Sequence, residues 1–204
     1  MRALASISLL AALVVFPVAA SASVIFTDGF QTATPGLGVS VAGNFTTTGG
    51  TNVDVLGPGV GTNYGYLCGA GFSQCVDLGG TGGNPSGQLV SNTTFSSGQY
   101  LLSFNLIGSG RANGDSVEVV FGDYDQIFFL NSNDTTTGVI TNQLVTVTGP
   151  TTLSLAFHDL DGTNESLILN AASVSTVPTP EPSSLLLLGS GVLSGLGFMS
   201  RRKR

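Results

Sequence analysis

The sequence has no tryptophan, one histidine, two cysteines and only six basic residues in 204 positions. Five of the basic residues lie at the two ends of the chain, so Arg111 is the only one in the central region. Eleven acidic residues share that region, which carries a formal charge of about −10. This charge repels nucleic acid and anionic lipid and argues against a phosphate-binding role. It is compatible with neutral glycans, with divalent cations or with solubility outside the cell.

The central region also lacks any stretch with helical periodicity, which disfavours an α/β fold with crossover helices. Strict alternation takes its place. At 99–108, Tyr100, Leu102, Phe104 and Leu106 share one face, and the stretches 116–121 and 152–159 repeat the pattern. Further strands are expected at 24–30, 39–45, 51–56, 74–78, 88–95, 127–130, 139–148 and 166–175. Glycine- and asparagine-rich separators between them predict an all-β, antiparallel β-sandwich.

The first 22 residues have the pattern of a signal peptide. Arg2 supplies a positive charge, and an apolar stretch at 4–18 follows it. Ala20 and Ala22 place small residues at the two positions that a signal peptidase reads, so we predict cleavage before Ser23. The alternative is an uncleaved membrane helix, which Pro17 and the small-residue exit disfavour.

Residues 177–204, the sorting segment, combine a proline-rich break, an apolar run at 185–199 and a basic end. The residues of this pattern are Pro180, Glu181, Pro182, Arg201, Arg202, Lys203 and Arg204. The run is shorter than the roughly 20 residues that a helix needs to cross a bilayer, and the cations resist translocation. The pattern resembles the PEP-CTERM sorting signal. That resemblance implies a transient membrane helix and processing near the tripeptide by an exosortase. The alternative is a permanent tail anchor.

Residues 23–176, the body, are long enough for one domain with its own core. The segment 97–104, Ser-Gly-Gln-Tyr-Leu-Leu-Ser-Phe, and the loop 108–117 that carries Arg111 resemble a recurrent extracellular module of PEP-CTERM proteins. That resemblance implies a jelly-roll sandwich similar to carbohydrate-binding domains. Members of that group often end on a strand with Asp-Asn-Val, whereas this chain has Asn170-Ala171-Ala172, without the carboxylate.

Cys68 and Cys75 are close in sequence, with two glycines between them. In an oxidising compartment such a pair favours a disulfide, for which the short loop gives an entropic contribution of about 2 to 3 kcal/mol. A metal site would need further soft ligands, and the neighbouring sequence has none.

The acidic turn at 158–165 is the candidate metal site. Its oxygen ligands would be Asp159, Asp161, Glu165 and the Thr163 carbonyl, the kind of ligand set that Ca²⁺ prefers. The alternative is an Asp-Gly hairpin turn with solvated charges. His158 next to Asp159 suggests a catalytic arrangement only weakly, because no nucleophile signature accompanies it.

Glycan binding would need an exposed aromatic ring on which a sugar can stack. The candidates are Tyr64, Tyr66 and Tyr124, which lie in glycine- and aspartate-rich stretches. The alternative is that these rings cover the rim of the core.

We therefore expect an exported, acidic β-sandwich that acts as a non-enzymatic structural or glycan-associating protein of the cell surface or polysaccharide matrix. An enzyme that acts on polysaccharide and a calcium-stabilised adhesin are the alternatives. The expected partners are the export machinery, signal peptidase, an exosortase and extracellular polysaccharide, with no nucleic acid. No cofactor other than Ca²⁺ is expected.

Overall fold

The computed structural model describes residues 21–60, 68–82, 86–110, 115–158, 166–178 and 189. Residues Ala22–Val177 form one compact unit, which extends one residue beyond the predicted body at each end. The helices predicted within 1–22 and at 185–199 lie outside the described residues, apart from residues 21, 22 and 189. Within the described ranges, no helix is long and apolar enough to span a membrane.

The described part of the body is built from antiparallel strands. Their bounds are β1 (Val24–Asp28), β2 (Gly36–Val39), β3 (Val41–Ala42), β4 (Phe45–Thr48), β5 (Val53–Leu56), β6 (Cys75–Asp77), β7 (Ser86–Ser91), β8 (Gly98–Ile107), β9 (Asp115–Phe121), β10 (Tyr124–Leu130), β11 (Gly138–Val147), β12 (Ser154–His158) and β13 (Ile168–Thr176). The all-β fold class predicted from alternation is confirmed.

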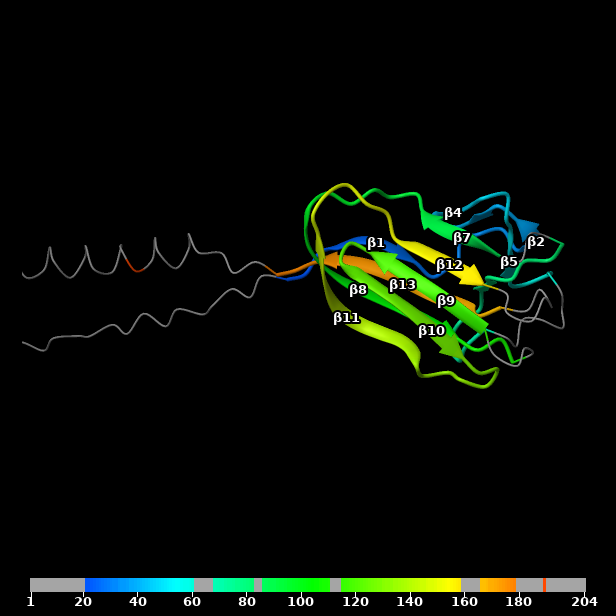
Figure 1. Ribbon diagram of the computed structural model, residues 1–204. Coiled ribbons are helices and arrows are strands. Elements are labelled where there is room, and N and C mark those ends of the chain that lie inside the picture. Colours follow the sequence, from blue (N-terminus) through cyan, green and yellow to red (C-terminus); the bar gives the residue numbers. More distant parts are fainter. Residues whose placement is uncertain are drawn as a thin grey trace, which may run out of the picture. The chain divides into compact units, whose positions relative to one another are not determined.

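The strands form two sheets that pack as a β-sandwich (Figure 1). Sheet A has the order β11-β8-β13-β6-β5-β2, and β1 pairs with β13 beside β6. Sheet B has the order β10-β9-β12-β7-β4-β3. Strands that are distant in sequence therefore lie next to each other, as β13 and β8 do in sheet A.

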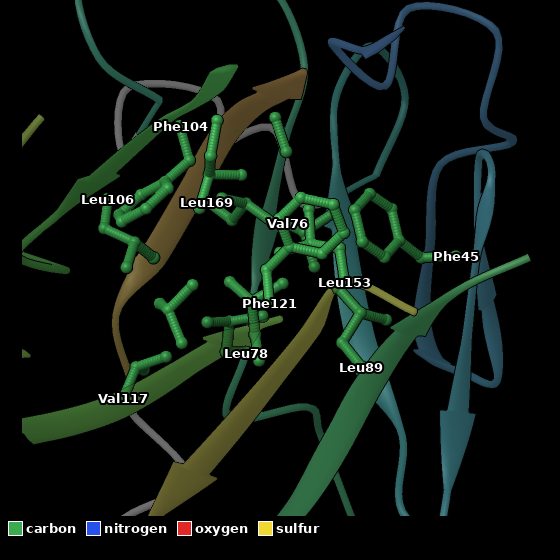
Figure 2. Close-up of a cluster of buried hydrophobic side chains, with 14 of the residues drawn as sticks. Phe45, Val76, Leu78, Leu89, Phe104, Leu106, Val117, Phe121, Leu153 and Leu169 are labelled. Atoms are coloured by element: carbon green, nitrogen blue, oxygen red, sulfur yellow. The ribbon is translucent and has the colours of Figure 1, made fainter. Parts of the chain in front are cut away.

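The core lies between the inner faces of the two sheets, where side chains from both layers meet (Figure 2). Strand β8 shows why these residues form this element, because its buried positions alternate with half-exposed ones along the strand. The four residues predicted to face inward are all buried: Tyr100, Leu102, Phe104 and Leu106. Sheet B contributes Val117, Val119 and Phe121 from β9 in the same way.

Aromatic side chains join the two layers. Phe26 of sheet A meets Phe45 of sheet B edge to face, with ring centroids 5.3 Å apart. At the opposite end of the core, Phe104 meets Phe128 in the same geometry at 5.4 Å. Such pairs contribute about 0.5–1.5 kcal/mol each beyond the area they bury, so they help to fix how the sheets stack.

Turn chemistry interrupts one predicted strand. The stretch 39–45 was expected to be continuous, but the chain reverses within it and forms the hairpin of β3 and β4. Gly43 occupies the left-handed region at φ 58°, and the Asp28 carboxylate accepts the Asn44 N–H. A side chain at Gly43 would meet that carboxylate, so the turn requires glycine.

The two ends of the body leave sheet A at the same place, where β1 begins and β13 ends (Figure 1). The Thr176 N–H donates to the Ser23 carbonyl at 2.9 Å, and the Ser23 N–H donates to the Thr176 hydroxyl at 3.1 Å. The predicted first residue of the mature chain is therefore held by the last residue of the final strand.

Candidate functional site

The disulfide between Cys68 and Cys75 is present, with Cα atoms 5.5 Å apart. Cys75 lies in β6 and is fully buried in a small apolar cluster with Leu56, Ile107 and Ile168. This cluster is separate from the main core, and the cystine packs against it. The disulfide therefore covers apolar side chains as well as closing a loop.

The Asn170 side chain links the disulfide loop to sheet A. It is fully buried, accepts the Gly69 N–H at 3.1 Å and donates to the Asn105 Oδ1 at 3.0 Å. Sequence reasoning noted Asn170 only as a missing carboxylate. In the structure the amide is what this position needs, because an ionised carboxylate could accept from Gly69 but could not donate to Asn105.

Two buried carboxylates have structural partners. Asp28 accepts the backbone N–H of Phe30 at 2.7 Å together with that of Asn44. Asp54 accepts the N–H groups of Gly38 and Thr81 and also the Thr81 hydroxyl, at 2.6–2.8 Å. Backbone N–H groups hold both carboxylates in place, so these residues tie loops to strands.

The predicted calcium ligands, Asp159, Asp161, Thr163 and Glu165, lie outside the described residues. In the described part of the chain, no group of three or more His, Cys, Asp or Glu side chains is close enough to hold a metal ion. The calcium site therefore stays a prediction.

Of the three candidate tyrosines, Tyr64 and Tyr66 lie outside the described residues. Tyr124 begins β10 and is half-buried, with its ring against Phe104 at a centroid distance of 6.3 Å. Burial raises the pKa of its hydroxyl above the ordinary value. The ring thus covers the rim of the core, and its stacking on a sugar stays a prediction.

Asp134 shows the strongest described electrostatic effect. Hydrogen bonds from the Thr137 hydroxyl and from the backbone N–H groups of Thr137 and Thr136 lower its pKa to about 2. Both N–H groups reach its Oδ1 at 2.9–3.0 Å. This exposed carboxylate organises the loop between β10 and β11.

The outer face of sheet B carries a run of neutral polar side chains, which we call the polar ladder. It consists of Thr46, Thr48, Gln88, Asn92 and Ser154. The Thr48 hydroxyl donates to Gln88 Oε1, Gln88 Nε2 donates to the Ser154 hydroxyl, and the Thr46 hydroxyl donates to Asn92 Oδ1. The register places Glu118 and Ile127 in line with Gln88 on the same face. Thr48 and Asn92 are exposed, Thr46 and Gln88 are half-exposed, and Ser154 is buried beneath the hydrogen bond from Gln88. The ladder therefore offers mainly the hydroxyls and amides of the first four residues.

The same face continues onto β10 with two exposed apolar side chains. Ile127 and Phe129 are 69% and 58% exposed. Sequence reasoning placed both in a strand but singled out neither as a site, because it did not establish that this strand would end a sheet. Phe129 is the described aromatic that stands furthest into solvent.

A shallow groove of about 250 Å³ crosses the outer face of sheet A. Small side chains of β8 and β13 line it, among them Ser103, Asn105, Ala171 and Ser173. The Ser103 hydroxyl accepts the Asn142 N–H, and Asn105 is the partner of Asn170. Two polar groups of the groove, those of Ser103 and Asn105, are thus already used to hold the bulge of β11 and the side chain of Asn170.

The chain matches the model of the PEP-CTERM protein-sorting motif over residues 178–203. The C-terminal segment is a PEP-CTERM sorting motif. It marks the chain as an exported surface protein that an exosortase processes. The match contains Pro180, Glu181 and Pro182 as well as the first three residues of the basic end, and Arg204 follows it. No curated protein matches the chain.

The PEP-CTERM motif begins two residues after β13 ends at Thr176. The body therefore supplies almost no linker of its own, and the proline-rich start of the motif connects directly to sheet A.

Proposed function

We propose that the body is a non-enzymatic component of the cell surface or polysaccharide matrix, and that it associates with neutral glycan through the polar ladder. The observation that carries this proposal is the ladder itself, in which hydrogen bonds hold one set of three and one pair of hydroxyl and amide side chains on the same sheet. Groups fixed before binding lose little conformational entropy when a ligand arrives, which favours association.

The charge of the body supports a neutral ligand. Among the residues of sheet B whose side chains the structure describes, the ionisable groups that the register places on the outer face are Glu118 and Asp125, and both are acidic. An anionic polymer would be repelled by these side chains and by the net charge of the body. Sugar hydroxyls both donate and accept hydrogen bonds, as do the hydroxyls of Thr46 and Thr48.

The signal peptide and the sorting segment give the body its route to the cell surface. Signal peptidase removes residues 1–22, and the apolar stretch at 185–199 holds the chain in the inner membrane until an exosortase cleaves it. Because Ser23 is held against Thr176, the predicted first residue of the mature chain and the end of the final strand lie at one corner of sheet A. The body is then free to enter the matrix with its outer faces accessible.

Affinity electrophoresis tests the proposed function. The mature chain is run through gels that contain matrix polysaccharide isolated from the producing cells, and we expect retardation that a gel containing a polyanion does not give. Gln88→Ala should remove most of the retardation, because Gln88 joins Thr48 to Ser154. Gln143→Ala is the matched control, since this exposed glutamine lies in β11 of sheet A.

Equal mobility of the mature chain with and without the polysaccharide would contradict the glycan proposal. Release of reducing ends from the polysaccharide by the mature chain would contradict the non-enzymatic proposal and favour a polysaccharide-degrading enzyme. A calcium-stabilised adhesin would instead lose thermal stability on chelation, which the present proposal does not require.

A further inference from the structure

The free edges of the two sheets differ in how they are protected. A free edge presents unpaired N–H and C=O groups, and proteins usually blunt it with bulges, short strands or charges. Among the described strands, β1, β2 and β11 have irregular registers, and β3 is two residues long. Strand β10, which ends sheet B, is different (Figure 1). It pairs with β9 over seven consecutive residues without a bulge.

The composition of β10 also leaves its edge open. The strand contains neither proline nor lysine, and Asp125 is its only charged residue. It is tied to β11 at the turn, where the Asp123 N–H donates to the Thr146 carbonyl at 3.0 Å. Beyond that turn, Ile127 and Phe129 expose most of their side chains. The edge from 125 to 129 is therefore regular, apolar and nearly uncharged.

The hairpin of β9 and β10 fixes which residues face outward. Its two-residue turn, Gly122 and Asp123, makes Phe121 and Tyr124 a hydrogen-bonded pair. Alternate residues from Tyr124 onward then bond to β9, and the backbone groups of Asp125, Ile127 and Phe129 point to the free edge. These residues also have exposed side chains.

We propose that β10 is a self-association edge, which pairs antiparallel with β10 of a second copy of this chain and joins two B sheets into one. A two-fold axis perpendicular to the sheet at Ile127 places Ile127 opposite its own counterpart. Phe129 of each copy then lies opposite Asp125 of the other. The four side chains of Ile127 and Phe129 gather on one face, and no two aspartates are opposite each other.

A second copy of the chain fits this edge because the register lets two identical strands pair without opposing like charges. Like charges directly opposite each other destabilise a strand pair, and the two-fold arrangement avoids that contact without any basic residue. Ile127 and Phe129 present exposed apolar side chains and also the backbone groups that point to the free edge. Strand β10 of each copy therefore supplies both the apolar contact and the hydrogen bonds of the pairing. Self-association through β10 is independent of glycan binding, because the polar ladder lies on β4, β7 and β12 and on Asn92 just after β7.

Cysteine cross-linking tests the axis directly. The mature chain has no free cysteine among its described residues, because Cys68 and Cys75 are bridged. Ile127→Cys should therefore give a disulfide-linked dimer on a non-reducing gel, since opposite residues of a hydrogen-bonded pair lie about 5.5 Å apart at Cα. Leu144→Cys, 51% exposed on the bulged edge of sheet A, is the control and should stay monomeric. Equal cross-linking of the two variants would overturn the proposal.

A pair of charge variants tests the register in sedimentation-equilibrium experiments on the mature chain. Phe129→Glu places one carboxylate opposite Asp125 in each half of the dimer, and we expect dimerisation to weaken about tenfold or more. Phe129→Lys places an ammonium opposite the same carboxylate, so the dimer should persist and become sensitive to salt. If Ile127 and Phe129 instead bound a glycan or another protein, both variants would lose that ligand and neither would change the self-association of the chain. That outcome, or an equal loss of dimer in both variants, would overturn the proposal.

Discussion

Removal of the Asn170 side chain should loosen the disulfide loop without touching the main core. In Asn170→Ala, the Gly69 N–H loses its acceptor and Asn105 loses its donor. Asn105 is half-exposed and can bind water instead, so the main cost is the half-buried Gly69 N–H. An orphaned group of this kind costs about 1–2 kcal/mol.

For a domain of this size that loss corresponds to a fall in Tm of about 3–6 °C. Circular dichroism of the mature chain during heating measures it. Asn92→Ala is the control, because Asn92 is exposed and its side chain accepts a hydrogen bond from the hydroxyl of the half-exposed Thr46, which water can replace. We also expect faster amide hydrogen exchange at 68–75 in Asn170→Ala alone. If both variants showed the same Tm and the same exchange at 68–75, the clamping role of Asn170 would be refuted.

Three further predictions concern the disulfide, a turn and a loop. Reducing the disulfide should destabilise the body by about 2 to 3 kcal/mol, measured by urea unfolding; an unchanged midpoint would contradict its role. Gly43→Ala should destabilise by about 2–4 kcal/mol, because the new methyl group meets the Asp28 carboxylate at a left-handed position. Gly49→Ala, also left-handed but facing open space, should have a smaller effect, and equal losses would refute the steric argument. Asp134→Ala should lower Tm at pH 7, where Asp134 is ionised and the hydrogen bonds that lower its pKa stabilise the folded loop. This difference in Tm should disappear as the pH falls through about 2, where the carboxylate of the folded state becomes protonated. A Tm difference that is constant from pH 7 to pH 2 would exclude this contribution.

Strand alternation was sufficient to predict most of the sandwich. In β8 and β9, the apolar residues recur at every second position, and burial follows that pattern. The same reasoning failed at 39–45, where Gly43 supplies a left-handed turn that hydrophobicity does not encode.

The candidate site was harder to predict because it depends on which strands become neighbours. Gln88 and Ser154 are 66 residues apart in sequence and meet only when β7 pairs with β12. Asn170 and Gly69 are 101 residues apart, so their hydrogen bond was equally hard to predict from the sequence. The disulfide and the sorting motif were predictable because each is local in sequence and is defined by residue type and spacing.

An exosortase processes this exported β-sandwich at its C-terminal motif. Intact-mass spectrometry of the protein recovered from the cell envelope and the medium tests this most directly. We expect a chain that begins at Ser23, keeps the disulfide and lacks the basic end from Arg201 to Arg204. A surface form that retains both the first 22 residues and the basic end would contradict the account.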